Sequence, residues 1–272
     1  MCLRLEKFDA SQMQPFTISL LLGRRNTGKS TLLKDLLFHL QEHSDVCICF
    51  TPTESAAALF RTITPGALVH DTGLSLAVLE QLMSVQREIG RTPGKTMRRV
   101  TLVLDDCSSN AAALRSPVIS DLFRNGRHQK ITVLLTSQYA TDLNPGLRAQ
   151  VDYTFCMRDG CVQNKKRLHQ LYAGSIAKFE DFSSVFNTVT SNYGVFAVDN
   201  TAVDGDVEST TFWYRASLKI PSFRLSNEVY YKLEKAPRRD SGVEVAVTQP
   251  KAPTAEVTLG TPSTVMRSPI AA

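Results

Sequence analysis

Gly23-Arg24-Arg25-Asn26-Thr27-Gly28-Lys29-Ser30 is the stretch that decides the fold of this 272-residue chain. It matches the phosphate-binding pattern G-x-x-x-x-G-K-[ST] at every fixed position. Glycine lets such a loop curl until its backbone N–H groups point at an anionic phosphate, and the next helix adds its positive N-terminal end. We therefore expect Gly23 to Thr31 to bind the phosphates of ATP. Lys29 would reach the β- and γ-phosphates, and the Ser30 hydroxyl would ligate Mg²⁺.

The neighbouring sequence supports this interpretation. Residues 16–22 form an apolar run of strand length, and residues 31–40 carry apolar side chains at helical spacing. A strand, a glycine loop and a helix in this order are the context in which the motif binds a nucleotide.

The chain then alternates strand-like and helix-like segments. Uninterrupted apolar runs at 46–51, 100–104, 131–138 and 151–157 are typical of parallel strands that are covered on both faces. Amphipathic stretches at 56–61, 74–89 and 114–123 predict helices between them. We therefore predict an α/β fold with a mostly parallel sheet between helices.

A second part follows the predicted sheet. Residues 165–172 and 178–189 predict helices, and 193–199 and 210–216 predict a β-hairpin around the polar turn 203–206. The expected organisation is an N-terminal arm (1–15), an ATPase domain (16–235) and a disordered tail (236–272). Within the domain we expect a core (about 16–160) and a C-terminal helical and hairpin extension (about 161–235). The tail is rich in proline, threonine and alanine and has no aromatic residue.

Composition excludes several classes of protein. The apolar fraction of 43% and the charged fraction of 21% are ordinary for a globular protein, and a net charge of +5 permits a polyanionic partner without arguing for one. No apolar run reaches membrane-spanning length, and no signal-peptide core is visible at the N-terminus. The six cysteines form no C-x-x-C pair, and four of them lie in or beside apolar runs. We expect buried thiols in an intracellular protein without membrane insertion.

Polar residues end two of the predicted strands. Asp105 follows residues 100–104 and is the expected Mg²⁺ partner of Ser30, directly or through water. Asp106 could act as base or orienter for the water that attacks the γ-phosphate, or could simply cap the next helix. Gln138 could contact the γ-phosphate or that water, or could be a surface residue at a strand end. Because such strand ends meet at one edge of a parallel sheet, we expect all three beside Gly23.

An arginine is expected to complete the site, because a permanently charged guanidinium suits the charge that develops on the γ-phosphoryl group. Arg127 is the first candidate, Arg148 the alternative and Arg124 a weaker one. Two basic clusters, at 91–99 and 165–167, could bind a polyanion or could be a mobile loop and a solvated helix face.

Several segments together resemble the FtsK–HerA superfamily of ring-forming DNA pumps. More narrowly, they are similar to the packaging ATPases of large nucleocytoplasmic DNA viruses. The segments are GRRNTGKS (23–30), TLVLDDC (101–107), FRNGRHQKITVLLTSQ (123–138), LRAQVDYTF (147–155), LHQLYAG (168–174), FNTVTSNYGVFAVDNT (186–201) and TFWYRA (211–216). The resemblance covers about residues 15–230, and its specific parts are NGRH before a strand ending in TSQ and the later WYRA.

The resemblance implies a RecA-like core and Mg²⁺-dependent ATP hydrolysis. It also implies a homo-oligomeric ring, expected to be hexameric, that drives double-stranded DNA into a capsid. By position, Lys29 and Ser30 would bind phosphate and metal, Asp105 the metal, and Gln138 would sense the γ-phosphate. Arg127 resembles in placement the arginine that such rings insert into a neighbour's site. Many relatives carry glutamate where this chain has Asp106, which leaves the group that activates the water open.

Three functions are compatible with the sequence. The leading one is an ATP-driven DNA translocase that packages a viral genome, with capsid proteins as further partners and the host cytoplasm, the viral assembly site or the virion as its location. The others are a non-catalytic nucleotide-binding subunit in virion assembly and a small-molecule kinase that uses the same loop.

Overall fold

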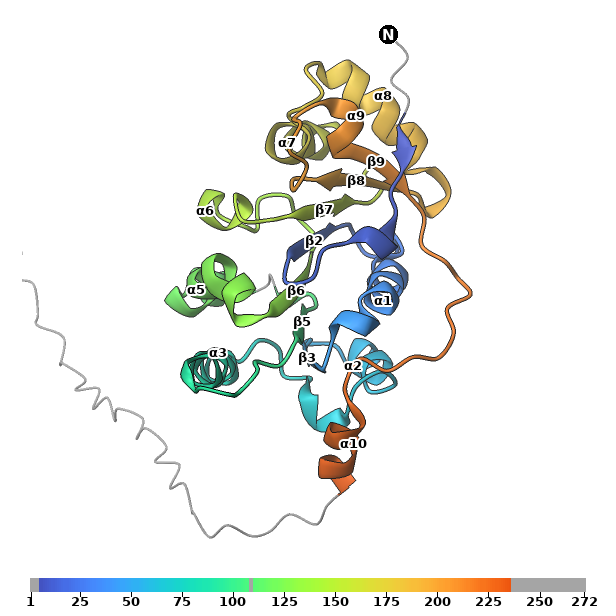
Figure 1. Ribbon diagram of the computed structural model, residues 1–272. Coiled ribbons are helices and arrows are strands. Elements are labelled where there is room, and N and C mark those ends of the chain that lie inside the picture. Colours follow the sequence, from blue (N-terminus) through green and yellow to red (C-terminus); the bar gives the residue numbers. More distant parts are fainter. Residues whose placement is uncertain (1–4, 108–109, 236–272) are drawn as a thin grey trace, which may run out of the picture. The chain divides into compact units, whose positions relative to one another are not determined.

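The computed structural model describes residues 5–107 and 110–235, which form a nine-stranded sheet between helices (Figure 1). The strands are β1 (Glu6–Lys7), β2 (Ile18–Leu22), β3 (Val46–Phe50), β4 (Val69–His70), β5 (Val100–Leu104), β6 (Ile131–Ser137), β7 (Tyr153–Cys156), β8 (Val195–Asp199) and β9 (Thr211–Tyr214). The helices are α1 (Lys29–His39), α2 (Glu54–Phe60), α3 (Leu76–Arg91), α4 (Ala111–Leu114), α5 (Pro117–Asn125), α6 (Pro145–Arg148), α7 (Val162–Tyr172), α8 (Phe179–Val189), α9 (Val207–Thr210) and α10 (Glu228–Lys235).

The strand order is β1-β9-β8-β7-β2-β6-β5-β3-β4. The six strands from β7 to β4 in this order all pair in parallel, whereas β8 pairs antiparallel with both β7 and β9. The predicted α/β class with a mostly parallel sheet is thus confirmed, and β8 and β9 form the predicted hairpin. This hairpin continues the same sheet beyond β7 (Figure 1).

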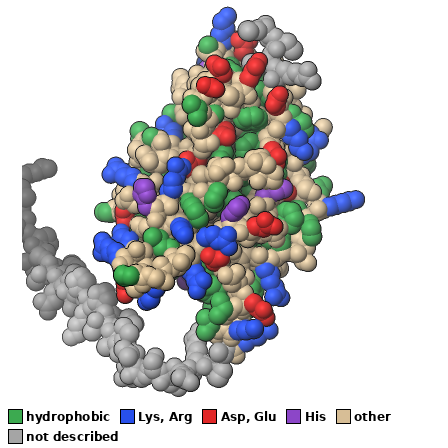
Figure 2. Space-filling view, in the orientation of Figure 1, with side chains coloured by type: hydrophobic (Ala, Val, Ile, Leu, Met, Phe, Trp, Pro, Cys, Tyr) green, Lys and Arg blue, Asp and Glu red, His purple; other side chains and the backbone are tan. Residues whose placement is uncertain are grey.

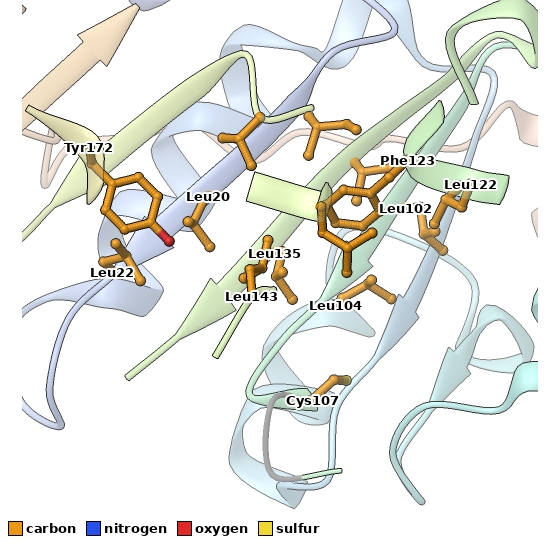
Figure 3. Packing of buried hydrophobic residues seen from close by; sticks show 14 of the residues in the cluster. Leu20, Leu22, Leu102, Leu104, Cys107, Leu122, Phe123, Leu135, Leu143 and Tyr172 are labelled. Atoms are coloured by element: carbon orange, nitrogen blue, oxygen red, sulfur yellow. The ribbon is translucent and has the colours of Figure 1, made fainter. Parts of the chain in front are cut away.

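The central strands β2, β3, β5, β6 and β7 bury both of their faces. Leu20 and Leu22 of β2 belong to one apolar core, with side chains of α3, α5, α7 and α8. Leu21 belongs to a second core on the opposite face, with side chains of α1 and α2. Figure 3 shows the first core, where Leu135 of β6 lies among Leu20, Leu104 and Leu143. Burial on both faces is why these strands lack polar alternation in the sequence.

The predicted helix 114–123 is wrong in one respect. Leu114 ends α4, and a separate helix, α5, begins at Pro117. The Ser116 hydroxyl accepts the N–H of Ile119, and proline occupies the first turn, where its missing N–H has no helical partner. This capping arrangement separates the two helices.

The two-residue strands β1 and β4 were not predicted, because such short segments carry no periodic signal. β1 lies in the predicted N-terminal arm and pairs with β9. The connection between β8 and β9 contains the unpredicted helix α9 after the polar turn. The predicted tail, 236–272, lies outside the described residues.

The segment after β9 runs across the face that α1 and α2 cover and ends in α10 beside β4 (Figure 1). Leu225 N–H donates to Ile63 O at 2.8 Å, and Glu234 accepts the N–H of Ala67 at 2.9 Å. These contacts attach the last described residues to the segment that precedes β4, one of the two edge strands of the sheet.

The thiols of Cys47, Cys49, Cys107 and Cys156 are buried and free, as expected for small core side chains, and Cys161 is exposed. Within residues 5–107 and 110–235, no helix has the length and apolar character required to cross a membrane.

Candidate nucleotide-binding site

The parallel register brings the predicted site residues to one edge of the sheet. Leu22 lies opposite Ser137, and Leu104 opposite Leu135, so β2, β5 and β6 end together. Gly23, Asp105 and Gln138 follow these ends directly. β2 lies beside β6, the strand that Gln138 follows, and β6 separates β2 from β5.

The loop between β2 and α1 needs glycine at both ends. A Cβ at Gly23 would lie 2.6 Å from Thr27 Oγ1 and 2.7 Å from Met157 Sδ. Gly28 has a φ of 94°, in the left-handed region that favours glycine, and forms the N-cap of α1. The Thr27 hydroxyl fixes the loop from inside by donating to Arg24 O at 2.7 Å. The loop therefore has the tight, preformed backbone that phosphate binding requires.

The Asp105 carboxylate is buried and held by two threonines from the neighbouring strand ends. Thr136 Oγ1 donates to Oδ1 at 2.8 Å, and Thr51 Oγ1 donates to Oδ2 at 3.3 Å. Thr136 lies near the end of β6, and Thr51 comes directly after β3. These are the two strands that flank β5. Hydrogen bonds of this kind fix the direction of a carboxylate that ligates a metal.

Asp106 and Gln138 are brought together. Gln138 Nε2 donates to the two carboxylate oxygens of Asp106 at 2.9 and 3.3 Å. Asp106 has a φ of 51°, and its N–H donates to Thr136 Oγ1 at 2.9 Å. The cap of α4 is Asn110, which accepts the N–H of Ala113.

Burial and charge compete at this edge. Burial lowers the pKa of Lys29, while the carboxylates of Asp106 and Asp105 act to raise it. Burial raises the pKa of Asp105, while the Thr136 hydrogen bond and the Lys29 charge act to lower it. The half-buried lysine and the buried carboxylate thus stabilise each other's charged form.

These residues fit a Mg²⁺ ion. Ser30, in the first turn of α1, offers an exposed hydroxyl, and Asp105 offers a carboxylate oriented by two hydrogen bonds. Hydroxyl and carboxylate oxygens are the hard ligands that Mg²⁺ prefers, together with phosphate oxygens and water. A cation beside Asp105 would also offset the cost of keeping this buried carboxylate ionised.

Arg127 does not lie at this site. It belongs to a 3₁₀ turn, Gly126–Gln129, before the start of β6, whereas Gln138 follows the end of that strand. Seven strand residues span roughly 20 Å, so the guanidinium is at the opposite edge of the sheet from the loop of its own chain. There it pairs with Asp152 at 2.7 Å and remains 61% exposed.

The other two arginine candidates differ in exposure. Arg148 is half-buried: its Nη2 donates to Leu143 O at 3.0 Å, and its guanidinium lies 5.8 Å from the centre of the Tyr172 ring. Arg124, near the end of α5, is exposed on the same edge as Arg127. Arg148 is therefore occupied inside its own chain, whereas Arg127 is free to meet another molecule on its open side.

The two basic clusters are partly occupied by local contacts. Lys165 is buried, and its Nζ donates to Asn187 Oδ1 at 3.1 Å. Arg99 pairs with Asp45 at 2.8 Å. On the face shown in Figure 2, basic and acidic side chains are interspersed. Lys165 is therefore not part of a solvated helix face and is not available to a polyanion.

Sequence reasoning missed the two threonines and Arg158. Thr51 and Thr136 each lie at the end of a strand that flanks β5, but only the strand order reveals this. Arg158 and Arg167 line a pocket together with Arg24 and Gln138. Arg158 follows β7 at the same edge as the loop, so its place after a parallel strand was a usable signal.

A family model described as "Poxvirus A32 protein" matches residues 6–210 of the chain. The uncharacterized protein 088R of Invertebrate iridescent virus 3 is 31% identical over 198 residues, covering 72% of this chain and 74% of that protein. The uncharacterized protein 075L of Invertebrate iridescent virus 6 is 32% identical over 194 residues, covering 71% and 74%.

Two solved structures share the fold. The DNA-packaging ATPase B204 from Sulfolobus Turreted Icosahedral Virus superposes with a TM-score of 0.55 at 15% identity, covering 75% of this chain and 100% of B204. The genome packaging NTPase B204 from Sulfolobus turreted icosahedral virus 2, in complex with AMP, gives a TM-score of 0.55 at 17% identity, covering 76% and 100%. At these identities the likeness establishes a common P-loop fold.

Proposed function

Because the chain belongs to the poxvirus A32 protein family, we propose that it is an ATP-hydrolysing motor that moves double-stranded DNA into a viral capsid. The observation that carries this proposal is the convergence of three strand ends at one edge of the sheet. There the loop Gly23–Ser30, the buried carboxylate of Asp105 and the bonded pair Asp106–Gln138 lie together. The fold shared with B204, which is named as a DNA-packaging ATPase, supports the cargo.

In this proposal the loop binds the triphosphate. Its backbone N–H groups and the N-terminal end of α1 surround the phosphates, and Lys29 neutralises charge on the β- and γ-phosphates. Ser30 and Asp105 would hold Mg²⁺, whose positive charge would offset the negative charge of the phosphates. Because Lys29 and Asp105 are partly or wholly buried, their electrostatic interactions are screened less by water than those of surface groups.

Asp106 and Gln138 act on the attacking water. The Asp106 carboxylate accepts a hydrogen bond from the water and acts as the general base that takes its proton. The Gln138 amide orients that carboxylate by donating a hydrogen bond to it. The same amide reaches the γ-phosphate when Asp106 releases it, so Gln138 senses whether the phosphate is present. Asp106 is one methylene shorter than glutamate, and its left-handed φ of 51° is part of what sets the carboxylate in reach of Gln138.

Arg127 acts on the site of a neighbouring chain. It cannot reach its own loop, it is exposed, and a guanidinium is the group that best stabilises charge on the transferred phosphoryl. We therefore infer a closed homo-oligomeric ring, with six chains as the expected number, in which each Arg127 completes the next site. Duplex DNA would pass through this ring, and capsid proteins would hold it at the viral assembly site.

The proposal is tested by measuring phosphate release from Mg²⁺–ATP with and without long linear duplex DNA. The expected result is turnover that rises severalfold with duplex DNA, since the cargo completes the working ring. Nucleotide binding with no turnover under either condition would instead indicate a non-catalytic assembly subunit. Transfer of the γ-phosphate to a small acceptor would indicate a kinase.

A further inference from the structure

Tyr193 stands beside the phosphate loop in an unusual backbone conformation. Its side chain is 71% exposed, the largest exposure of any aromatic residue among 5–107 and 110–235. Asn192 and Tyr193 both have left-handed backbone, with φ of 49° and 59°. Neither residue is glycine, so two consecutive positions are held in a region that L-residues rarely adopt.

The connection between α8 and β8 enforces this conformation. A Cβ at Gly194 would lie 1.9 Å from Val189 O, so the chain passes against the end of α8 at a distance that only glycine permits. Gly194 N–H also donates to Ser191 O at 2.9 Å, and Thr190 is buried and bonded to Phe186 O. The Tyr193 ring is therefore presented by a fixed turn.

The ring points at the loop. A Cβ placed on Gly28 would lie 3.3 Å from Tyr193 Cδ1, so the ring covers the residue before Lys29. Tyr193 also lines a cavity of about 360 Å³ that begins at Thr27, Gly28 and Thr31. Its other walls include Leu32, Val195 and Leu218, with Arg215 at its border. This volume lies within the range of ligand pockets, about 300–1,000 Å³.

Three pockets border the loop, and the base of a nucleotide whose phosphates occupy the loop would lie in one of them. On the side of Gly23 the pocket is lined by Arg24, Arg158, Arg167 and Gln138, whose charge suits the terminal phosphate. On the side of Thr31 the cavity is lined mainly by apolar side chains and by the exposed ring of Tyr193. The third pocket, which contains Asn26, Arg158 and Thr190, is mainly polar. A flat, weakly polar group fits the cavity beside Thr31 best, because its lining is the most apolar of the three.

We propose that the base of the bound nucleotide lies in the cavity beside Thr31 and stacks on the ring of Tyr193. Stacking on an aromatic ring suits any base, because every base has a π-face, and Arg215 at the border adds a cation to the same cavity. This inference deepens the proposed function and rests on it, since it presupposes a nucleotide in the loop.

The test compares ADP with pyrophosphate, which carries the phosphates without a base. Both are titrated calorimetrically into the full chain with Mg²⁺ present, for the wild type and for Tyr193→Ala. The expected result is a loss of ADP affinity of about 5- to 150-fold, the range measured for base–aromatic stacking, with pyrophosphate affinity unchanged. Tyr193→Phe, which keeps the ring, should bind both ligands as the wild type does.

Two further variants keep the test decisive. Tyr193→Gly accepts a φ of 59° without strain, so a loss of ADP affinity there cannot come from misfolding of the turn. Tyr230, on α10, lines none of the three pockets that border the loop. Tyr230→Ala should leave the ratio of ADP to pyrophosphate affinity as in the wild type.

Equal ADP affinity in the wild type, Tyr193→Ala and Tyr193→Gly would overturn the stacking proposal and leave the nucleotide site intact. An equal loss of ADP and pyrophosphate affinity would also overturn it, because Tyr193 would then only position the loop. A wild-type chain that binds neither ligand would overturn the proposed function itself.

Discussion

Replacing Lys29 with alanine is expected to reduce ATP turnover by roughly 100- to 1,000-fold, the effect of removing one group that stabilises transition-state charge. Lys29 is the first residue of α1, follows the left-handed Gly28 and is the cation that the loop directs at the phosphates. Its partial burial strengthens its pull on phosphate oxygens. The measurement is steady-state phosphate release from Mg²⁺–ATP by the purified full chain.

Lys34 provides the matched control, because it lies on the same helix, more than one turn further on. It is half-buried and lines none of the pockets that border the loop. Lys34→Ala should therefore hydrolyse ATP at the wild-type rate. Unchanged turnover in folded Lys29→Ala protein would contradict the assignment of the loop as the nucleotide site.

Removing the Arg127 guanidinium should leave nucleotide binding intact and lower turnover by about 1,000-fold or more, the range for an arginine supplied by a neighbour. The separation of the two effects follows from position, since Arg127 lies at the opposite edge of the sheet from its own loop. Binding of ADP is measured by titration calorimetry and turnover by phosphate release. Arg127→Lys keeps a positive charge near Asp152 but loses the planar fork, so it should also turn over slowly.

Mixing two inactive chains tests whether Arg127 acts between subunits. An Arg127→Ala chain has an intact loop, and a Lys29→Ala chain has an intact Arg127. When they assemble together, some interfaces pair the two intact elements, so part of the turnover should return. If mixing restores nothing and Arg148→Ala alone binds nucleotide without hydrolysing it, Arg148 is the acting arginine. Arg124→Ala, from the same exposed edge, is the matched control and should behave as the wild type.

The parts of the fold that the sequence predicted are those with strong local patterns. The loop Gly23–Ser30 predicts β2 before it and α1 after it. The continuous apolar runs predict β3, β5, β6 and β7 close to their observed bounds. The meeting of Asp105 and Gln138 at one edge could be predicted because strands joined by helices run parallel, so their C-terminal ends share an edge.

Other features depend on strand order, which no local pattern encodes. Thr51 and Thr136 can donate hydrogen bonds to Asp105 only because β3 and β6 lie on either side of β5. The Asp106–Gln138 hydrogen bond likewise needs β6 to lie beside β5. The sequence predicts a strand that begins at Tyr193, whereas Tyr193 ends a turn and β8 begins at Val195. Nothing in the sequence indicates that this turn presents the ring to Gly28.

The break between α4 and α5 could have been predicted from the sequence. Ser116 followed by Pro117 is a typical helix start, with a capping hydroxyl and proline in the first turn. The apolar spacing from Leu114 to Phe123 concealed it, because apolar residues on both sides of the break are buried. The periodicity was correct, but the continuity of the helix was not.

The central claim, that ATP hydrolysis moves this chain along duplex DNA, is tested most directly by displacement of a third strand. A linear duplex carries a bound triplex-forming oligonucleotide, and its release is followed over time with wild-type protein and ATP. We expect release that requires ATP and is absent with ADP or with Lys29→Ala. Wild-type protein that hydrolyses ATP in the presence of this duplex while the third strand stays bound would contradict the account.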